Sequence, residues 1–184
     1  MRVSITQIVL VTLFCWIIVV PAHADPDAVA ENRAARYPCE ADPRAHAFDF
    51  WIGDWNVYAG GQLAGTNSIY PILGHCALSE NWINAIGSEG KSYNFYDPGY
   101  DHWRQIWISD TQGPIEFVGE ARDGGIFYTA ETVNPADGSV TMHDFNFTVY
   151  DNGDVRQLWK TSADRGETWT VIWDGRYVRM SEED

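Results

Sequence analysis

From Phe48 onward, hydrophobic and polar residues alternate in short runs, which is the pattern of β-strands that bury one face. The runs are rich in aromatic and β-branched residues, and no helical periodicity persists among them. The pattern predicts strands over Phe50–Tyr58, Leu63–Leu73, Cys76–Ala85, Lys91–Tyr96, His102–Ser109, Ile115–Glu120, Ile126–Val133, Val140–Tyr150, Val155–Ser162 and Thr168–Met180.

Short segments of Gly, Asp, Asn and Pro separate the predicted strands and favour tight hairpins. The clearest are Ala59-Gly60-Gly61, Asp97-Pro98-Gly99, Asp123-Gly124-Gly125, Asn134-Pro135-Ala136-Asp137-Gly138 and Asp151-Asn152-Gly153. Strands joined by hairpins in sequence order form an antiparallel meander, and a long meander avoids unpaired edges by closing on itself. We therefore expect an all-β domain over residues 48–180, an antiparallel up-and-down barrel of about ten strands.

Residues 25–47 precede the predicted barrel and have a different, Ala-rich composition at their start. Asp25 can cap a helix and Pro26 suits its first turn, so a short helix to about Arg36 is expected. Pro38 and Pro43 would end it. We expect a helical and loop extension in front of a single domain.

The first 24 residues have the features of a cleavable secretory signal. Arg2 supplies the positive charge, the apolar run from Ile8 to Val20 follows, and Ala22-His23-Ala24 is a cleavage site of small residues. A membrane anchor is the less favoured alternative, since a spanning helix needs about 20 apolar residues and this run is shorter. No lipobox surrounds Cys15. We expect a secreted or periplasmic protein, with no membrane insertion after cleavage.

Acidic residues outnumber basic ones by 26 to 12, which gives a net charge of −14 with His neutral. Cleavage after Ala24 would remove one further basic residue, Arg2. Such a surface repels nucleic-acid phosphates and anionic lipid headgroups. The charge therefore excludes nucleic acid from the expected partners.

The cysteines predict one disulfide. Cys15 lies in the predicted signal, which leaves Cys39 and Cys76 as a pair in an oxidising compartment. A bridge would close a loop of about 38 residues and stabilise the fold by about 4 kcal/mol on the chain-entropy model. Two buried free thiols are the alternative.

Several motifs resemble one family. Gly53-Asp54-Trp55 resembles the Gly-x-Trp motif of the lipocalin-like superfamily, where the Trp can plug the closed end of a barrel. The resemblance becomes more specific with GHCALSENW from Gly74, GKSYNFYDP from Gly90 and RQLW from Arg156. Together they resemble an uncharacterised, mostly secreted bacterial family with a lipocalin-like barrel. The resemblance implies that fold from about Phe48 to Arg179 and no established reaction.

The segment Ser162–Trp169 matches the Ser-x-Asp-x-Gly-x-Thr-Trp pattern of the Asp-box in sialidase-type propellers. The carboxylate of such a box accepts hydrogen bonds from turn N–H groups, and its Gly takes the positive-φ position. A propeller repeats the box in each blade, and this sequence has one copy. We therefore interpret the motif as a hairpin that Asp164 stabilises.

Motifs for metals, cofactors and nucleophiles are absent from the sequence. The four histidines after the signal form no recognised ligand spacing, and no Gly-x-Ser-x-Gly elbow occurs. Asp151-Asn152-Gly153-Asp154 lacks the distant Glu of a calcium loop and is interpreted as a turn. Heme on a strand histidine, His102 or His143, is a weaker alternative. We expect no metal and no cofactor.

Residues two apart share one face of a strand, so the more aromatic face of each strand is expected to point inward. Those faces carry Leu78, Glu80 and Trp82; Ser92, Asn94 and Tyr96; Trp103, Gln105 and Trp107; Val155, Gln157 and Trp159; and Trp169, Val171 and Trp173. Aromatic walls with a few polar groups suit a ligand cavity. The candidate ligand-binding residues are Glu80, Trp82, Asn94, Gln105, Trp107, Gln157, Trp159 and Trp173. A filled core is the alternative.

Three functions fit this inner face. The leading hypothesis is non-catalytic binding of a small apolar or aromatic molecule in the barrel lumen. The second is an enzyme in which buried Glu80 acts as general acid or base on an apolar substrate. The third is a carbohydrate or envelope interaction module, which requires exposed aromatic side chains on the outer face or rim.

Overall fold

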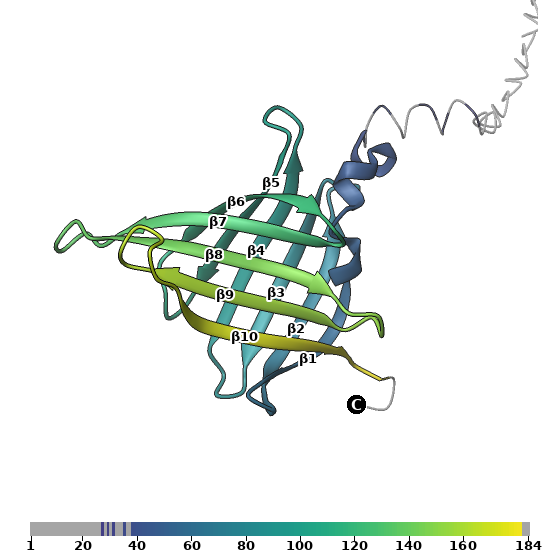
Figure 1. Ribbon diagram of the computed structural model, residues 1–184. Helices are drawn as coiled ribbons and strands as arrows, with labels where there is room; N and C mark the ends of the chain where they lie inside the picture. Colours follow the sequence, from purple (N-terminus) through teal and green to yellow (C-terminus); the bar gives the residue numbers. More distant parts are fainter. Residues whose placement is uncertain (1–26, 28, 30, 32–34, 36–37, 182–184) are drawn as a thin grey trace, which may run out of the picture.

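A closed barrel of antiparallel strands forms the body of the molecule (Figure 1). The computed structural model describes residues 27, 29, 31, 35 and 38–181. Each strand pairs with its neighbours in sequence, and β1 pairs with β10 to close the barrel. The strands are β1 (Gly53–Ala59), β2 (Gln62–Ile72), β3 (Ala77–Asn84), β4 (Glu89–Asp97), β5 (His102–Ser109), β6 (Ile115–Arg122), β7 (Gly125–Val133), β8 (Val140–Val149), β9 (Val155–Ser162) and β10 (Thr170–Arg179). This order confirms the predicted up-and-down barrel.

Short helical turns precede the barrel, as expected. Three 3-10 helices, η1 (Pro38–Ala41), η2 (Pro43–His46) and η3 (Asp49–Trp51), lead into β1. Residues 27, 29, 31 and 35 are helical, and the rest of the predicted helix lies outside the described residues, as does the predicted signal of residues 1–24. Within the described part of the chain, no helix is long and apolar enough to cross a membrane.

The predicted start of the first strand was wrong, because η3 occupies residues that the pattern assigned to it. Phe48 and Trp51 are fully buried, and their rings stack with centroids 4.9 Å apart. A 3-10 turn places both side chains inside the end of the barrel, which an alternating strand could not do. In Figure 1 these helices, in dark blue, lie at the right-hand end of the barrel, opposite the long β7–β8 hairpin.

Trp55 completes this closed end. It is fully buried, and its indole Nε1 donates a hydrogen bond to the carbonyl of Trp51 at 2.8 Å. The guanidinium of Arg179 lies 4.3 Å from the centroid of the Trp55 ring and donates to the carbonyl of Ile52 at 3.0 Å. These contacts join the first and last strands over the plug.

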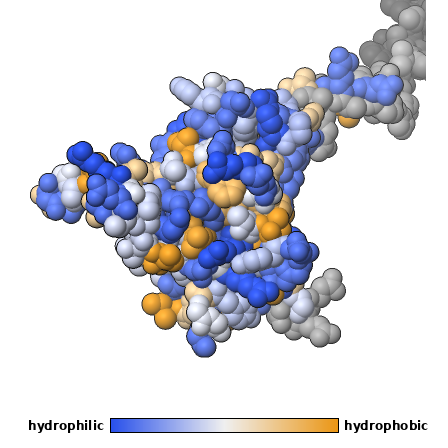
Figure 2. Space-filling model, in the orientation of Figure 1, coloured by the Kyte–Doolittle hydropathy of each residue, from blue (hydrophilic) through white to orange (hydrophobic). Residues whose placement is uncertain are grey.

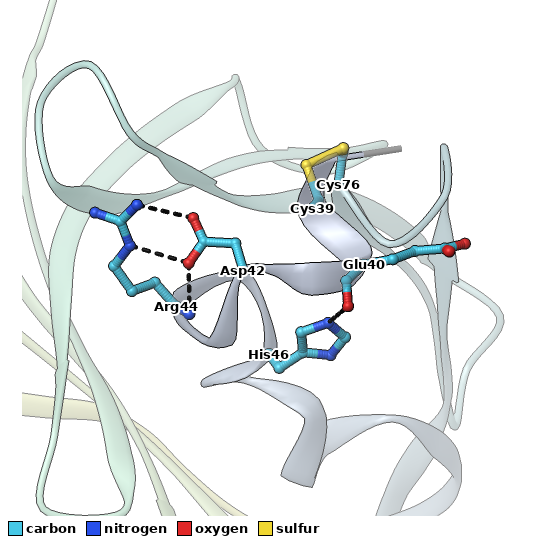
Figure 3. Close-up of a disulfide and its surroundings, with 6 residues drawn as sticks. All are labelled: Cys39, Glu40, Asp42, Arg44, His46 and Cys76. Carbon is cyan, nitrogen blue, oxygen red and sulfur yellow. Dashed lines mark hydrogen bonds and ion pairs between the residues drawn. A yellow bond between two sulfur atoms is a disulfide. The ribbon is translucent and has the colours of Figure 1, made fainter. Parts of the chain in front are cut away.

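The disulfide Cys39–Cys76 is present and confirms the predicted pairing. It joins η1 to the turn between β2 and β3, with the two Cα atoms 4.9 Å apart (Figure 3). The bridge fixes the N-terminal helical segment against the closed end of the barrel. Because it links positions 37 residues apart, it restricts the unfolded chain more than a short loop would.

The predicted inward faces are buried or partly buried in β3, β4, β5 and β9, but the prediction for β10 was partly wrong. Trp169 and Val171 are 39% and 54% exposed. A register shift between Val171 and Trp173 in the pairing with β9 reverses the alternation, as a β-bulge does. After this irregularity, Trp173, Gly175 and Tyr177 face inward.

The Asp-box segment is a hairpin between β9 and β10. Asp164 accepts hydrogen bonds from the backbone N–H and the hydroxyl of Thr168 at 2.9 and 2.5 Å, and from the hydroxyl of Ser162 at 2.6 Å. These bonds lower the pKa of Asp164 to about 2. The geometry agrees with a turn stabilised by its carboxylate.

The outer surface in view is mostly hydrophilic, with separate hydrophobic spots (Figure 2). This distribution agrees with the large negative charge. The apolar aromatic residues are concentrated instead inside the barrel. The interior is therefore where the candidate site is found.

Candidate functional site

A cavity of about 230 Å³ lies in the barrel toward the end opposite the plug. Its aromatic wall is contributed by six strands, and Gln112 and Ile172 lie beside it on the loop after β5 and the start of β10. The lining consists of Glu80, Trp82, Trp107, Gln112, Phe117, Phe145, Gln157, Trp159, Ile172, Trp173 and Tyr177. The interior at this end is therefore hollow and not filled.

Three of the four tryptophans have ring atoms in the space that a side chain on a glycine would occupy. A side chain at Gly90 would overlap the six-membered ring of Trp107, and one at Gly65 would meet Cη2 of Trp82 at 2.7 Å. A side chain at Gly175 would meet Nε1 of Trp173 at 2.6 Å. Since no Cβ pushes these rings inward, space remains in the lumen.

The tryptophans also support one another. Trp82 and Trp173 meet edge to face, with centroids 5.8 Å apart. Trp159 packs against Phe145 at 5.0 Å and against Phe117 at 5.6 Å, which form the deeper aromatic wall. Such contacts hold the rings in fixed positions.

Glu80 supplies the ionisable group of the cavity and is 2% exposed. Its carboxylate accepts a hydrogen bond from Asn67 Nδ2 at 2.7 Å on Oε1 and one from Ser92 Oγ at 2.5 Å on Oε2. Burial raises the pKa of Glu80 to about 7, and these two hydrogen bonds oppose that rise only in part. Glu80 therefore changes charge near neutral pH.

A second set of hydrogen bonds extends from Glu80 to the opposite wall. Asn67 Nδ2 also donates to the hydroxyl of Tyr177 at 3.2 Å, and that hydroxyl donates to Gln157 Oε1 at 3.0 Å. This chain joins β2, β3, β9 and β10 across the barrel. It orients Gln157 beside the cavity.

Six of the eight predicted ligand-binding residues line the cavity, and Asn94 and Gln105 do not. Both are fully buried behind it and donate to Ser92 Oγ, from Asn94 Nδ2 at 2.8 Å and from Gln105 Nε2 at 3.4 Å. They hold the hydroxyl that bonds Glu80. The structure therefore places them as supports of the polar network.

Four buried polar atoms around the site have no hydrogen-bond partner within the described residues. Two are acceptors, Asn67 Oδ1 and Gln105 Oε1, and two are indole donors, Nε1 of Trp107 and of Trp173. The Trp173 nitrogen lies against the backbone of Gly175. Trp107 lines the cavity, and a shift of its ring would bring this buried donor to a molecule there.

His143 does not offer a free nitrogen for heme. Its Nδ1 accepts from Trp159 Nε1 at 3.1 Å, so its Nε2 carries the proton and donates to Thr132 Oγ1 at 2.9 Å. Burial lowers the pKa of His143, which favours the neutral ring. His102 lies elsewhere, with its ring stacked on Tyr100.

Sequence reasoning missed several residues of the site. Asn67 shares its strand face with Gly65 and Ile69, so the two-residue period could have identified it. Phe117 and Phe145 likewise alternate with exposed or half-buried neighbours. Gln112 lies in a loop, where no periodic signal exists.

Comparison with protein-family models finds no match for this chain, and comparison with curated proteins finds none either. The family resemblance of the motifs therefore stays a prediction, while the ten-stranded antiparallel barrel is established by the structure.

Proposed function

We propose that this protein binds a small, neutral aromatic or apolar molecule in the barrel without chemically changing it. The observation that carries the proposal is the cavity of about 230 Å³ whose walls are tryptophan rings held against glycines. A core that served stability alone would gain by filling this space.

The size of the cavity defines the ligand class. A dry cavity of about 150 Å³ lined by apolar side chains holds benzene, so the larger volume here suits a single substituted ring. A net negative charge and the carboxylate of Glu80 disfavour an anionic ligand. The proposed ligand is thus one aromatic ring with a small uncharged substituent.

The substituent is expected to accept a hydrogen bond. Nε1 of Trp107 is a buried donor that lacks a partner within the described residues, in a side chain that lines the cavity. A carbonyl or ether oxygen on the ligand would satisfy it, which contributes about 0.5–1.5 kcal/mol. Toluene and acetophenone are suitable probes, since they differ mainly in this acceptor.

The direct test is calorimetric titration with each probe, together with ¹H–¹⁵N spectra of the indole N–H groups. We expect one molecule bound per chain and shifts at Trp82, Trp107, Trp159 and Trp173. Trp51 and Trp55 at the closed end serve as internal controls and should not shift. No heat and no shift near probe saturation, or shifts confined to the closed end, would refute the proposal.

Catalysis is a second candidate function, and Glu80 is the residue that supports it. A carboxyl with a pKa of about 7 beside an apolar cavity is suited to proton transfer at neutral pH. Both of its oxygens already accept hydrogen bonds, which favours the binding role. Under the catalytic alternative, Glu80→Gln would abolish turnover of a substrate and leave its binding nearly unchanged.

The proposal locates this binding in the periplasm or outside the cell. The N-terminal signal predicted from the sequence supports that location, and the Cys39–Cys76 disulfide suits an oxidising compartment. The interaction-module alternative has less support. Four tryptophans line the cavity, whereas Trp169 is the one described tryptophan among the exposed residues, together with tyrosines such as Tyr93 and Tyr100.

A further inference from the structure

Two histidines and an aspartate meet at the closed end of the barrel, away from the cavity. His46 ends η2, Asp49 begins η3, and His75 lies in the turn between β2 and β3. Their potential ligand atoms all lie within 4.8 Å of one another. Within the part of the chain that the structure describes, this is the one such group of three.

Asp49 lies between the two imidazoles and contacts both. Its Oδ2 is 2.7 Å from Nδ1 of His46, and its Oδ1 is 2.7 Å from Nε2 of His75. The two rings face each other with centroids 4.0 Å apart. All three groups therefore converge on one small volume.

The protonation of Nε2 in His46 determines whether Nδ1 has a lone pair available for a metal ion. Nε2 lies 3.1 Å from the backbone carbonyl of Glu40, which only accepts hydrogen bonds, so Nε2 carries a proton (Figure 3). In the neutral ring Nδ1 then has a lone pair, and this lone pair faces a carboxylate oxygen. Such an arrangement needs a cation between the two atoms, either a second proton or a metal ion.

We propose that His46, Asp49 and His75 form a binding site for a divalent transition-metal ion, with Zn²⁺ as the first candidate. Two imidazoles and one carboxylate are a ligand set that Zn²⁺ uses, and a histidine that ligates a metal commonly donates its other N–H to a carbonyl. The bond from His46 to the Glu40 carbonyl already provides this support.

The group must rearrange to take the ion. Ligand atoms of a tetrahedral Zn²⁺ site with bonds of about 2.0–2.1 Å are about 3.3 Å apart, so the two 2.7 Å contacts would widen by about 0.6 Å. The ligand atoms now lie within 4.8 Å of one another, so the longest separation would close by up to about 1.5 Å. The ion would replace the protons that now lie in these contacts. Arg44, two residues before His46, is held by Asp42 at 2.9 Å and does not occupy the position.

The ion would keep an open coordination position and would join two parts of the chain. The side chains of His46, Asp49 and His75 are 32%, 35% and 19% exposed, so water reaches the group from one side. The Cys39–Cys76 disulfide joins the same two segments, since Cys76 follows His75 directly. The bridge thus holds the two histidines near each other before an ion binds.

The test is Zn²⁺ titration of the untagged protein after chelator treatment. We expect one Zn²⁺ per chain, a higher melting temperature with Zn²⁺, and at least about tenfold weaker binding in His75→Ala. His102→Ala is the matched control, since His102 belongs to no such group in the described chain, and it should bind like the wild type.

Asp49→Asn keeps the shape of the site but removes its negative charge. If His75→Ala fails to fold, Zn²⁺ uptake by Asp49→Asn tests the proposal instead. Co²⁺ in place of Zn²⁺ should give the intense visible absorption of a four-coordinate ion in the wild type. Failure of the wild type to take up one ion, or unchanged uptake in both His75→Ala and Asp49→Asn, would overturn the proposal. The cavity function would be unaffected by either result.

Discussion

The six-membered ring of Trp107 covers the Cα of Gly90 on the neighbouring strand, in the space that a side chain would need. The three atoms nearest to a Cβ at this position all belong to Trp107, at 2.1, 2.5 and 3.0 Å. A single methyl group at residue 90 would therefore act on one ring. Because Trp107 lines the cavity, displacement of its ring toward the lumen would reduce that space.

Gly90→Ala is expected to displace Trp107 into the cavity and weaken the binding of toluene at least about tenfold, with a stability loss of about 1–3 kcal/mol from overpacking. Calorimetry and urea unfolding measure the two effects. Gly113→Ala is the matched control, since a Cβ there meets no atom within 4 Å, and it should bind normally. Normal toluene binding by Gly90→Ala would show that Trp107 does not border the binding site.

Trp107→Phe keeps an aromatic ring on the wall and removes the indole donor. Acetophenone binding should weaken by about 0.5–1.5 kcal/mol more than toluene binding, because only acetophenone loses a hydrogen bond. Calorimetric titration of both probes with both proteins completes the comparison. Equal losses for the two probes would mean that the Trp107 N–H does not contact the ligand.

Glu80 is expected to make the protein less stable as pH rises. Its folded pKa of about 7 lies above the ordinary value of 4.5, so protonation favours the folded state. This stabilisation is complete below about pH 4.5 and is lost as the pH rises through 7. Between about pH 5 and pH 8 the change amounts to about 2–3 kcal/mol.

Glu80→Gln isolates this contribution, because all other titrating groups remain. Urea unfolding at several pH values should show the wild type losing about 2–3 kcal/mol relative to the variant over that range. The two stability profiles would run parallel if Glu80 had an ordinary pKa in the folded protein.

Replacing both Cys39 and Cys76 with Ser should lower the free energy of unfolding by about 4 kcal/mol on the chain-entropy model, since the bridge closes a long loop. Thermal or urea unfolding measures this loss. Thiol labelling of the denatured, unreduced wild type is the control and should find neither cysteine reactive. An unchanged melting temperature in the double variant would contradict the predicted stabilisation.

The sequence alone determined the class of fold and most of its strands. Alternation of polar and apolar residues and the chemistry of tight turns are local properties, so they can be read without knowing what lies across the barrel. The same rule identified the inward faces of β3 to β5 and thus Glu80, Trp82 and Trp107. The rule failed at Phe50–Ile52, where a 3-10 helix at the closed end replaces the strand. It also failed at the start of β10, where a register shift breaks the alternation.

Only the tertiary structure decided that one end of the barrel holds a cavity and which polar groups reach it. The space depends on Trp82 and Trp107 lying over glycines of neighbouring strands, and this depends on register and ring orientation. Likewise, His46 and His75 lie far apart in sequence and meet through the closed end of the barrel. Local pattern fixes which face a side chain takes, whereas contacts between distant segments fix which side chains meet and how much space they leave.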